Sequence, residues 1–335
     1  MELNMMMKRT EFAALAVAAL FLCGCESAWN PFAHDASDAV RVATYNIRLA
    51  TGDKGTSNAW EERRDDMVGL VRRLDVDAGG LQEVRPEQMA FLRERFPEFE
   101  FVGEHRGADR VSDEASPVFY RKSRFVAEKK GTFWLSETPD VPGVKGWGAA
   151  CPRVCSYLVL RDKSTGKRFC FANTHTDHVS ALAREKGMML VIERMREFGA
   201  GAPIVFTGDH NCRETEAPAE AVSKLLRNAL YVSETPPEGP WRTFNGWQWR
   251  EKEVSTGDAV KLPADVRNAR MGSPDADKKV GNGRHVWEDC GARIDYIYVS
   301  PGVRVVDYAT VGDPRPGRKL YPSDHFPIVA TIELP

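Results

Sequence analysis

The sequence predicts a single α/β domain that begins near residue 40. Three observations lead to this prediction: strand and helix patterns alternate along the chain, several strands between residues 99 and 173 follow one another without a helix, and neither an internal repeat nor a second apolar core stands out. The 335 residues are 42% hydrophobic and 28% charged, with a net charge of -2. This composition is ordinary for a globular protein and gives no general attraction to nucleic acid or anionic lipid.

The first 25 residues predict an export signal outside the fold. Two basic residues precede an apolar run at 12–22, which is too short to span a bilayer. The stretch L-C-G-C at 22–25 resembles a bacterial lipobox. We therefore expect an exported lipoprotein, anchored to a membrane by lipid on Cys25 in the periplasm or at the cell surface. An ordinary signal peptide or an uncleaved anchor is the alternative, and residues 26–39 are the predicted tether.

The first two strands of the domain end in polar residues. A strand that starts at Val40 ends at Asn46, and a short strand at 78–81 delivers Glu83. The helix between them has Asn58 as its expected N-cap. Four arginines are expected on the solvated face of this helix: Arg63, Arg64, Arg72 and Arg73.

The middle of the chain predicts antiparallel ribbons. A helix is expected from Pro86, followed by strands at 99–102, 117–120, 132–135, 154–160 and 169–173. The last of these strands leads to His175. A helix with Met188, Val191, Met195 and Phe198 on its inner side comes next.

The stretch P-I-V-F-T-G-D-H-N at 203–211 is the centre of the predicted site. Its apolar run reads as a strand buried on both faces, and Gly208 is expected to end it with a turn. In an extended chain Asp209 and Asn211 point the same way and His210 points the other way. A carboxylate can accept a proton or hold a cation, and an amide can donate a hydrogen bond, which suits one water and one phosphate oxygen.

The last third of the chain contains a helix, a long loop and two more strands. The helix is expected at 219–230, and the loop at about 231–285 is expected to be functional or partly disordered. Its tryptophans are expected to pack on the body, with an aromatic rim around a cleft as the alternative. Alternation in the strand 293–299 places Asp295 on an apolar face, where a carboxylate needs a partner. His325, which follows Asp324 at the start of the final strand, can be that partner.

Six short pieces in the same order resemble the endonuclease/exonuclease/phosphatase superfamily. They are T-Y-N-I at 44–47, L-Q-E-V at 81–84, N-T-H at 173–175, G-D-H-N at 208–211, R-I-D-Y at 293–296 and S-D-H-F-P-I at 323–328. The resemblance implies a four-layer sandwich of two packed β-sheets, mixed or antiparallel, flanked by helices. It also implies a metal-dependent phosphoester hydrolase, with a phosphodiesterase as the first choice, in which a water activated by an aspartate attacks phosphorus in line.

The resemblance assigns a metal and a catalytic role to individual residues. Glu83 would hold Mg²⁺ or Mn²⁺ with the help of Asn46 and Asp324, since hard cations prefer such oxygen ligands. Asp209 would orient or deprotonate the attacking water. The remaining implied groups all act on the phosphate: Asn211 and His175 would bind it, and His325, braced by Asp295, would stabilise the transition state or relay a proton.

Some neighbouring residues leave two readings open. Arg153, in a segment that resembles a bacterial subgroup of the family, and His178 are candidate substrate contacts together with Asn46, but either could be an ordinary strand or loop residue. His210 and Thr176 depart from the apolar residues usual in the family. They lead us to expect a more polar surrounding of the site.

The cysteines, the partners and the competing functions stay open at this stage. Apart from Cys23 and Cys25 there are five cysteines, an odd number, among which Cys151 and Cys155 are the most local candidate pair. A zinc site made of cysteines is disfavoured by their spacing. We expect a monomer that acts on a phospholipid headgroup, a sugar phosphate or nucleic acid. The alternatives are an inactive surface binding protein on the same fold and, more remotely, a cysteine hydrolase that uses Cys212.

Overall fold

The computed structural model describes residues 38–261, 279–280, 284–285 and 292–335. Residues 34–335 form one compact unit. The predicted signal peptide, almost all of the predicted tether and Cys290 lie outside the described residues. Ala39, which the sequence assigned to the tether, already belongs to the first strand.

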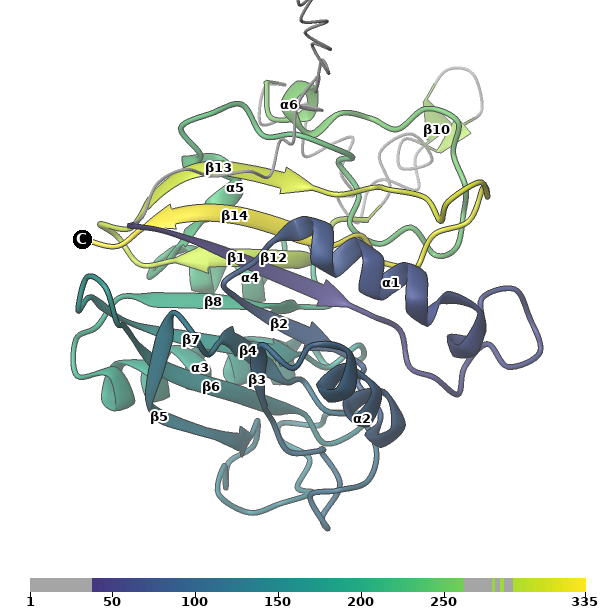
Figure 1. Cartoon of the computed structure of the whole chain (residues 1–335). Helices are drawn as coiled ribbons and strands as arrows, with labels where there is room; N and C mark the ends of the chain where they lie inside the picture. The colour runs from purple at the N-terminus through teal and green to yellow at the C-terminus, as the bar shows by residue number, and fades with distance from the viewer. Residues whose placement is uncertain (1–37, 262–278, 281–283, 286–291) are drawn as a thin grey trace, which may run out of the picture. The chain divides into compact units, whose positions relative to one another are not determined.

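Two six-stranded sheets form the centre of this unit (Figure 1). The first sheet has the order β13 (Arg304–Thr310), β14 (Ile328–Glu333), β1 (Ala39–Asn46), β2 (Ala78–Gln82), β4 (Val118–Arg121) and β3 (Phe99–Val102). The second has the order β5 (Phe125–Trp134), β6 (Val154–Asp162), β7 (Arg168–His175), β8 (Ile204–Asp209), β12 (Asp295–Val299) and β9 (Arg227–Asn228). Both sheets are mixed, because β1 runs parallel to β2 and β7 runs parallel to β8. Two further strands, β10 (Lys279–Val280) and β11 (Arg284–His285), pair only with each other.

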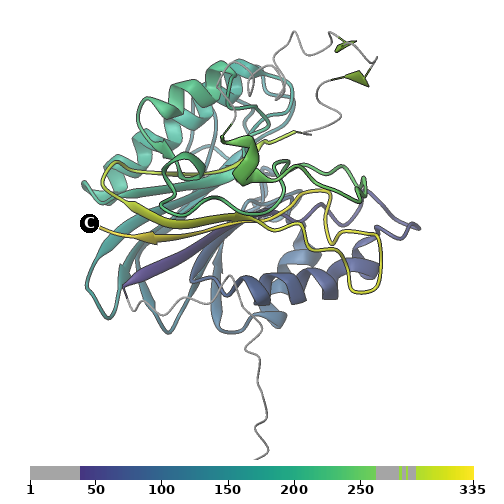
Figure 2. The ribbon, with the colours of Figure 1, turned by 90° about the horizontal axis from the view of Figure 1, so that it is seen from above.

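Helices cover the outer faces of the two sheets (Figure 2). The first sheet carries α1 (Trp60–Leu74) and α2 (Pro86–Arg95), and the second carries α3 (Ala181–Gly199) and α4 (Ala217–Ser223). Two single-turn helices, α5 (Ala229–Val232) and α6 (Thr256–Ala259), complete the described part. The predicted four-layer α/β sandwich is therefore confirmed.

Apolar side chains fill both the space between the sheets and the space under the helices. Between the sheets lie Val42, Ala78, Val118, Leu158, Phe171, Val205 and Ile297. Under α3, as its spacing predicted, Met188, Val191 and Met195 pack on the outer face of the second sheet. Each fully buried side chain of this size stabilises the fold by roughly 1.5–3 kcal/mol.

A polar clasp joins the two sheets beneath the site. Asn173 on β7 donates through Nδ2 to the carbonyl oxygens of Leu81 (2.8 Å) and Pro117 (3.0 Å) in the other layer. Its Oδ1 accepts from Gln82 Nε2 at 2.6 Å. Gly80 is required opposite, because a Cβ there would lie 2.2 Å from Asn173 Cγ. With all its hydrogen bonds inside the protein, this amide fixes one sheet against the other.

Two expectations about the helices were wrong. The cap of α1 is Ala59, because the backbone at Asn58 is used differently: its carbonyl oxygen accepts from Arg63 Nε at 2.9 Å. The helix expected at 219–230 is interrupted, since β9 pairs with β12 instead. Asn228 then caps the short α5 by accepting from the Leu230 amide, a local bond that competes with a continuous helix.

The long loop is partly ordered within the described ranges. Trp241 is buried in the apolar layer between the sheets, as expected for a loop that packs on the body. Trp249 is partly exposed and stacks on Tyr321 with ring centroids 5.3 Å apart. The part of the loop from residue 262 onward lies largely outside the described residues.

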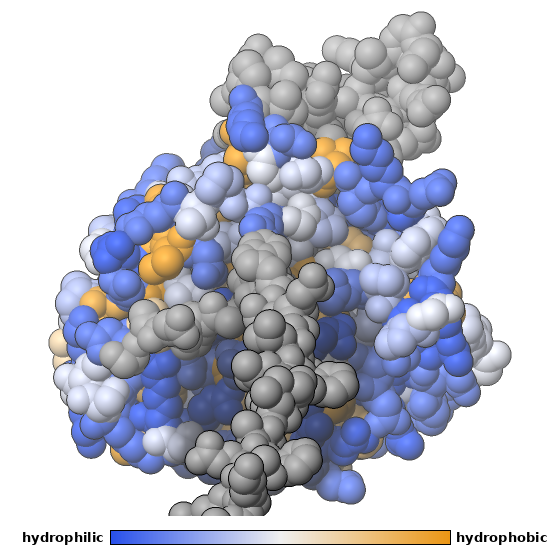
Figure 3. Space-filling model, turned by 45° about the horizontal axis from the view of Figure 1, so that its top comes forward, coloured by the Kyte–Doolittle hydropathy of each residue, from blue (hydrophilic) through white to orange (hydrophobic). Residues whose placement is uncertain are grey.

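Neither the described helices nor the visible surface carries a large apolar element. Within the described ranges, the structure contains no helix whose length and apolar character would let it cross a membrane. The face in Figure 3 is mainly hydrophilic, and the hydrophobic residues visible there lie in small separate patches. Such scattered apolar residues are normal for a protein surface.

Candidate active site

The predicted site residues come together at one end of the sandwich because the strands that carry them end there. In the second sheet, His175 at the end of β7 lies beside Asp209 at the end of β8, and Asp295 at the start of β12 is the antiparallel partner of Asp209. The turn expected at Gly208 is wrong. Gly208 lies within β8, where the close carbonyl oxygen of Thr174 would be 2.1 Å from a Cβ. A glycine is therefore needed to bring these strand ends together.

Asn46 links the two sheets within the site. Its side-chain amide donates to Glu83 Oε1 at 3.0 Å and to Asp209 Oδ2 at 2.9 Å. Its Oδ1 accepts from the Arg48 amide at 3.0 Å. Glu83 Oε2 in turn accepts from the Leu49 amide at 3.0 Å. Asn46 thus holds both carboxylates at a fixed separation, and its predicted role as a metal ligand or substrate contact stays a prediction.

His325 lies between two buried carboxylates. Its Nδ1 is 2.9 Å from Asp295 Oδ2, and its Nε2 is 3.7 Å from Asp209 Oδ2. Burial opposes a charge on His325, but the charges of Asp295 and Asp209 outweigh it and raise the pKa of His325 to about 10. Burial, with the charge of Asp295 added, raises the pKa of Asp209 to about 7. The two carboxylates therefore keep His325 protonated, and Asp209 can gain or lose a proton near neutral pH.

Asn211 and His175 lie on the other side of Asp209. Asn211 Nδ2 donates to the Thr176 carbonyl oxygen at 3.1 Å and contacts His175 Nε2 at 2.8 Å, while the Asn211 backbone amide donates to Asp209 Oδ1. Burial, with the charges of nearby arginines added, lowers the pKa of His175 well below its usual value. His175 is therefore neutral and accepts at Nε2, so Asn211 must exchange this bond to donate to a substrate.

A pocket of about 340 Å³ opens over these residues. Its walls are rich in charge, and the basic side chains are Arg48, Arg106, Arg153, His175, His178 and His325. Arg153 is 5% exposed and donates to His178 Nδ1 at 2.9 Å, so the two candidate substrate contacts lie together on the pocket wall. The same walls also hold the carboxylates of Glu83, Glu114, Asp209 and Asp324. The size of the pocket fits a small ligand, whose anionic group the arginines can bind.

The residues predicted to bind a metal fit that role in their chemistry. Glu83 and Asp324 are buried carboxylates on the same pocket wall. Burial, with the charge of Glu83 added, raises the pKa of Asp324. Arg48 Nη1 is 3.5 Å from Asp324 Oδ2 and compensates part of this charge. Two crowded hard oxygen donors of this kind suit Mg²⁺ or Mn²⁺. Asp209, Asp295 and His325 also present ligand atoms within 4.8 Å of one another, but the His325–Asp295 hydrogen bond already occupies one nitrogen there.

Arg63 was expected in solvent, and this expectation was wrong. Its side chain is fully buried and donates to the carbonyl oxygens of Ile47 (2.6 Å), Arg48 (2.8 Å) and Pro322 (3.0 Å). Burial lowers its pKa to about 10. Arg63 shares the inner helical stripe with Trp60, so its spacing could have identified it. It fixes the two loops that present Arg48 and Asp324.

Sequence reasoning missed three charged pocket residues, Arg48, Arg106 and Glu114. Arg106 Nη2 donates to Glu114 at 2.9 Å, and both line the pocket. They come from a loop without periodic pattern, where charged residues read as solvated. Arg48 follows the T-Y-N-I piece directly, which is the one signal that could have pointed to it.

Residues 176 and 210 do not make the site more polar. The fully buried His210 ring points away from the pocket and stacks on Tyr298, with ring centroids 5.6 Å apart. Thr176 is buried too, and its hydroxyl donates to the His210 carbonyl oxygen. The side chains of both residues therefore serve packing, and the expectation of a more polar surrounding was wrong.

Four cysteines lie in the described ranges, and all four are free thiols. They are Cys151, Cys155, Cys170 and Cys212. The local pair of Cys151 and Cys155 is therefore not joined. Burial raises the pKa of the Cys212 thiol far above its usual value, which argues against a thiolate nucleophile there.

Comparisons with known proteins agree with this geometry. The model of the Endonuclease/Exonuclease/phosphatase family matches residues 43–325. A solved structure of a family member from Bacteroides thetaiotaomicron is 32% identical with a TM-score of 0.72, and the match covers 89% of this chain and 95% of that one. A mannosyl-6-phosphatase from the same organism is 32% identical with a TM-score of 0.71, over 88% of this chain and 99% of that one.

Matches to curated proteins are more distant. Nocturnin from Drosophila melanogaster is 24% identical over 297 residues, which is 82% of this chain. The matches span 35% to 59% of the lengths of the curated relatives. The family model and the solved structures cover almost all of the described domain. The chain therefore belongs to the endonuclease/exonuclease/phosphatase family, whose members are metal-dependent phosphoester hydrolases, as its six sequence pieces predicted.

Proposed function

We propose that this phosphoesterase removes a terminal phosphate from a small hydroxylated alcohol such as a sugar. The observation that carries the proposal is the position of Asp209, which contacts Asn46 at 2.9 Å and lies 3.6 Å from His175 and 3.7 Å from His325 in a pocket of about 340 Å³ with three arginines on its walls. A carboxylate in this setting can take a proton from a water, and the surrounding donors can hold phosphate oxygens.

Each residue contributes a separate step in this proposal. Asp209 accepts the proton of the attacking water, and Asn46 keeps its carboxylate oriented. Asn211 gives up its contact with His175 and donates to a phosphate oxygen, while protonated His325 donates through Nε2 to the oxygens that gain charge. When Glu83 and Asp324 hold a divalent ion, that ion supplies positive charge beside the phosphate.

The preference for a monoester rests on charge and on one relative. A terminal phosphate carries up to two negative charges, and Arg106 and Arg153 on the pocket wall offer guanidinium groups for them. The mannosyl-6-phosphatase is similar to this chain over nearly its whole length, and its name describes removal of phosphate from a sugar. The diester substrate that the sequence favoured stays a prediction.

Hydrolysis of two chromogenic esters tests the proposal. We expect metal-dependent release from p-nitrophenyl phosphate, slower release from bis-p-nitrophenyl phosphate, and loss of both with EDTA or in Asp209→Ala. Faster release from the diester would restore the diesterase prediction. Mannose 6-phosphate and a panel of phospholipids and nucleic acids are then tested as substrates. If no ester is hydrolysed while the Asp209→Ala protein binds the same ligands as the unchanged protein, the inactive binding protein is favoured instead.

A second part of the proposed function is the location of the enzyme in the cell. We infer from the lipobox-like sequence alone that the enzyme is exported and held at a membrane by lipid on Cys25. Labelling with a fatty acid analogue in a bacterial host should mark the unchanged chain but not Cys25→Ala. Equal labelling of both would refute the anchor.

A further inference from the structure

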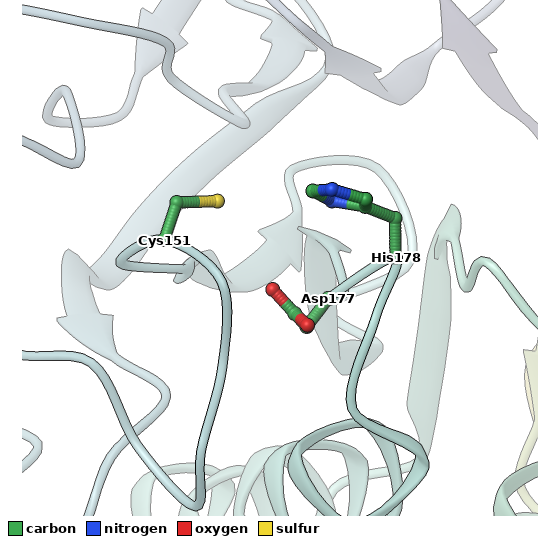
Figure 4. Close-up of side chains that lie close together, drawn as sticks. All are labelled: Cys151, Asp177 and His178. Atoms are coloured by element: carbon green, nitrogen blue, oxygen red, sulfur yellow. The ribbon is translucent and has the colours of Figure 1, made fainter.

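Three side chains capable of binding a metal meet at the pocket, in a group that contains neither Glu83 nor Asp324. They are Cys151, from the loop before β6, and Asp177 and His178, from the turn before α3 (Figure 4). One ligand atom of each lies within 4.8 Å of those of the other two. Cys151 and His178 also line the pocket itself. The group therefore combines sulfur, oxygen and nitrogen donors at the edge of the substrate site.

We propose that Cys151, Asp177 and His178 bind a thiophilic divalent cation such as Zn²⁺, and that its binding inhibits the hydrolysis of phosphate esters. Binding of the cation does not depend on the proposed function, whereas the inhibition rests on the proposed hydrolysis of phosphate esters. The donor set decides between cations, because thiolate and imidazole suit Zn²⁺ and carboxylate oxygens suit Mg²⁺. Three protein ligands also leave a fourth position for water.

The carboxylate of the site is held in place by backbone amides. Asp177 Oδ1 accepts from Val179 (3.0 Å) and Ser180 (2.9 Å), and Oδ2 accepts from Ala150 (3.0 Å). The last bond comes from the residue directly before Cys151, so it ties the two loops together. Oδ2 keeps a second lone pair for a cation. Ligands in metal sites are commonly oriented by such additional hydrogen bonds.

The three side chains need only a small movement to bind Zn²⁺. Bonds of 2.0 to 2.3 Å to a tetrahedral Zn²⁺ place its ligand atoms about 3.5 Å apart, so atoms that lie within 4.8 Å of one another need to approach by at most about 1.3 Å. Cys151 is partly exposed, which allows this movement. On binding, the thiol of Cys151 loses its proton to solvent and its sulfur forms a bond to the cation.

Arg153 connects the proposed site to the phosphate pocket. Its Nη2 donates to His178 Nδ1 at 2.9 Å, and its Nε is 3.7 Å from Asp177 Oδ2. Because arginine only donates, the Nδ1 lone pair of His178 accepts this bond and the ring proton lies on Nε2. A cation at Nδ1 must displace Arg153. The cation and a correctly placed Arg153 therefore exclude each other.

Cobalt substitution tests the site without any substrate. The full chain titrated with Co²⁺ in excess Mg²⁺ should show a near-ultraviolet charge-transfer band from thiolate to Co²⁺, which Zn²⁺ abolishes. The band should be lost in Cys151→Ser and in His178→Ala, with folding checked by circular dichroism. Asp324→Asn is the matched control, since it changes the predicted Mg²⁺ site and should keep the band. A band of equal strength in Cys151→Ser, or no band in the unchanged protein, would overturn the site.

Inhibition is measured separately. With Mg²⁺ present, Zn²⁺ should inhibit hydrolysis of p-nitrophenyl phosphate by the unchanged protein, and Cys151→Ser should need about tenfold more Zn²⁺ or higher, as expected when a metal ligand is lost. Equal inhibition of both proteins would mean that Zn²⁺ acts at Glu83 and Asp324, and would overturn the regulatory part. If the protein hydrolyses no ester at all, the proposed function fails while the cobalt spectrum still decides the site.

Discussion

His210 is the sharpest test of this packing, because its ring is buried among aromatic side chains. Neither Nδ1 nor Nε2 makes a hydrogen bond of ordinary geometry. The ring lies against Phe206 (centroids 4.8 Å apart), Tyr296 and Tyr298 (both 5.6 Å). Burial lowers the pKa of His210 to about 4, although the charge of Asp295 and the backbone of Thr207 work in the opposite direction. The folded protein therefore holds this ring neutral.

The sign of the pH effect follows from this pKa. In the unfolded chain the histidine pKa is about 6.5, so between pH 6.5 and 4 the unfolded state binds the extra proton and the folded state does not. Acid therefore favours unfolding in this window. For pKa values of about 6.5 and 4, the loss is about 2 kcal/mol at pH 5 and close to zero at pH 7.5. The His210→Phe variant does not lose this free energy of unfolding at low pH, because the phenylalanine ring does not bind a proton.

The assay is urea unfolding of the unchanged protein and His210→Phe at pH 7.5 and pH 5. The difference in free energy of unfolding between the two proteins should shift by about 2 kcal/mol in favour of the variant as pH falls. Steric effects of the larger ring cancel, because they are the same at both pH values. Hydrolysis at pH 7.5 should be unchanged, since His210 does not line the pocket. An equal loss of stability in both proteins would refute the reasoning.

Four further predictions concern the site. Asp209→Asn should fold normally but hydrolyse p-nitrophenyl phosphate about 10²-fold to 10⁴-fold more slowly, and activity above a tenth of normal would exclude Asp209 as the base. Asp295→Asn should lower the pKa of His325 from about 10 in an NMR titration, because a neighbouring charge is removed; no shift would contradict the pairing. Glu83→Gln should raise the Mg²⁺ concentration needed for activity about tenfold or more, and an unchanged requirement would remove Glu83 from the metal site. Arg63→Met leaves several carbonyl oxygens without a donor and should cost about 3 kcal/mol in urea unfolding, whereas a loss below 1 kcal/mol would mean that water replaces the guanidinium.

Sequence patterns identified the parts of the site that depend on strand ends. Short apolar runs predicted buried strands, and the polar residues after them, such as Glu83 and Asp209, were expected at one edge of the fold for that reason. The pairing of Asp295 with His325 also followed from alternation, because a carboxylate on an apolar face needs a partner. These inferences succeed since they use only the local direction of side chains.

Contacts between distant segments could not be predicted in the same way. Arg63 is stabilised in the interior by carbonyl oxygens from two separate loops, one of them about 260 residues away. Gly208 fits a narrow space that only the neighbouring strand creates. The interrupted helix after Ser223 depends on a free edge of β12. In each case the deciding partner lies on another element, and a single sequence does not say which elements meet.

The clasp around Asn173 has a consequence for how this enzyme can change. One half of the proposed site, with Glu83 and Asp324, lies next to strands of the first sheet, and the other half, with Asp209, belongs to the second. Sliding of the layers by even a fraction of an ångström would separate the two halves. Since Asn173 and its glycine neighbour forbid such sliding, the chemistry is locked to the scaffold. New substrate preferences can then arise only from the loops around the pocket, which are free to vary without disturbing the reacting groups.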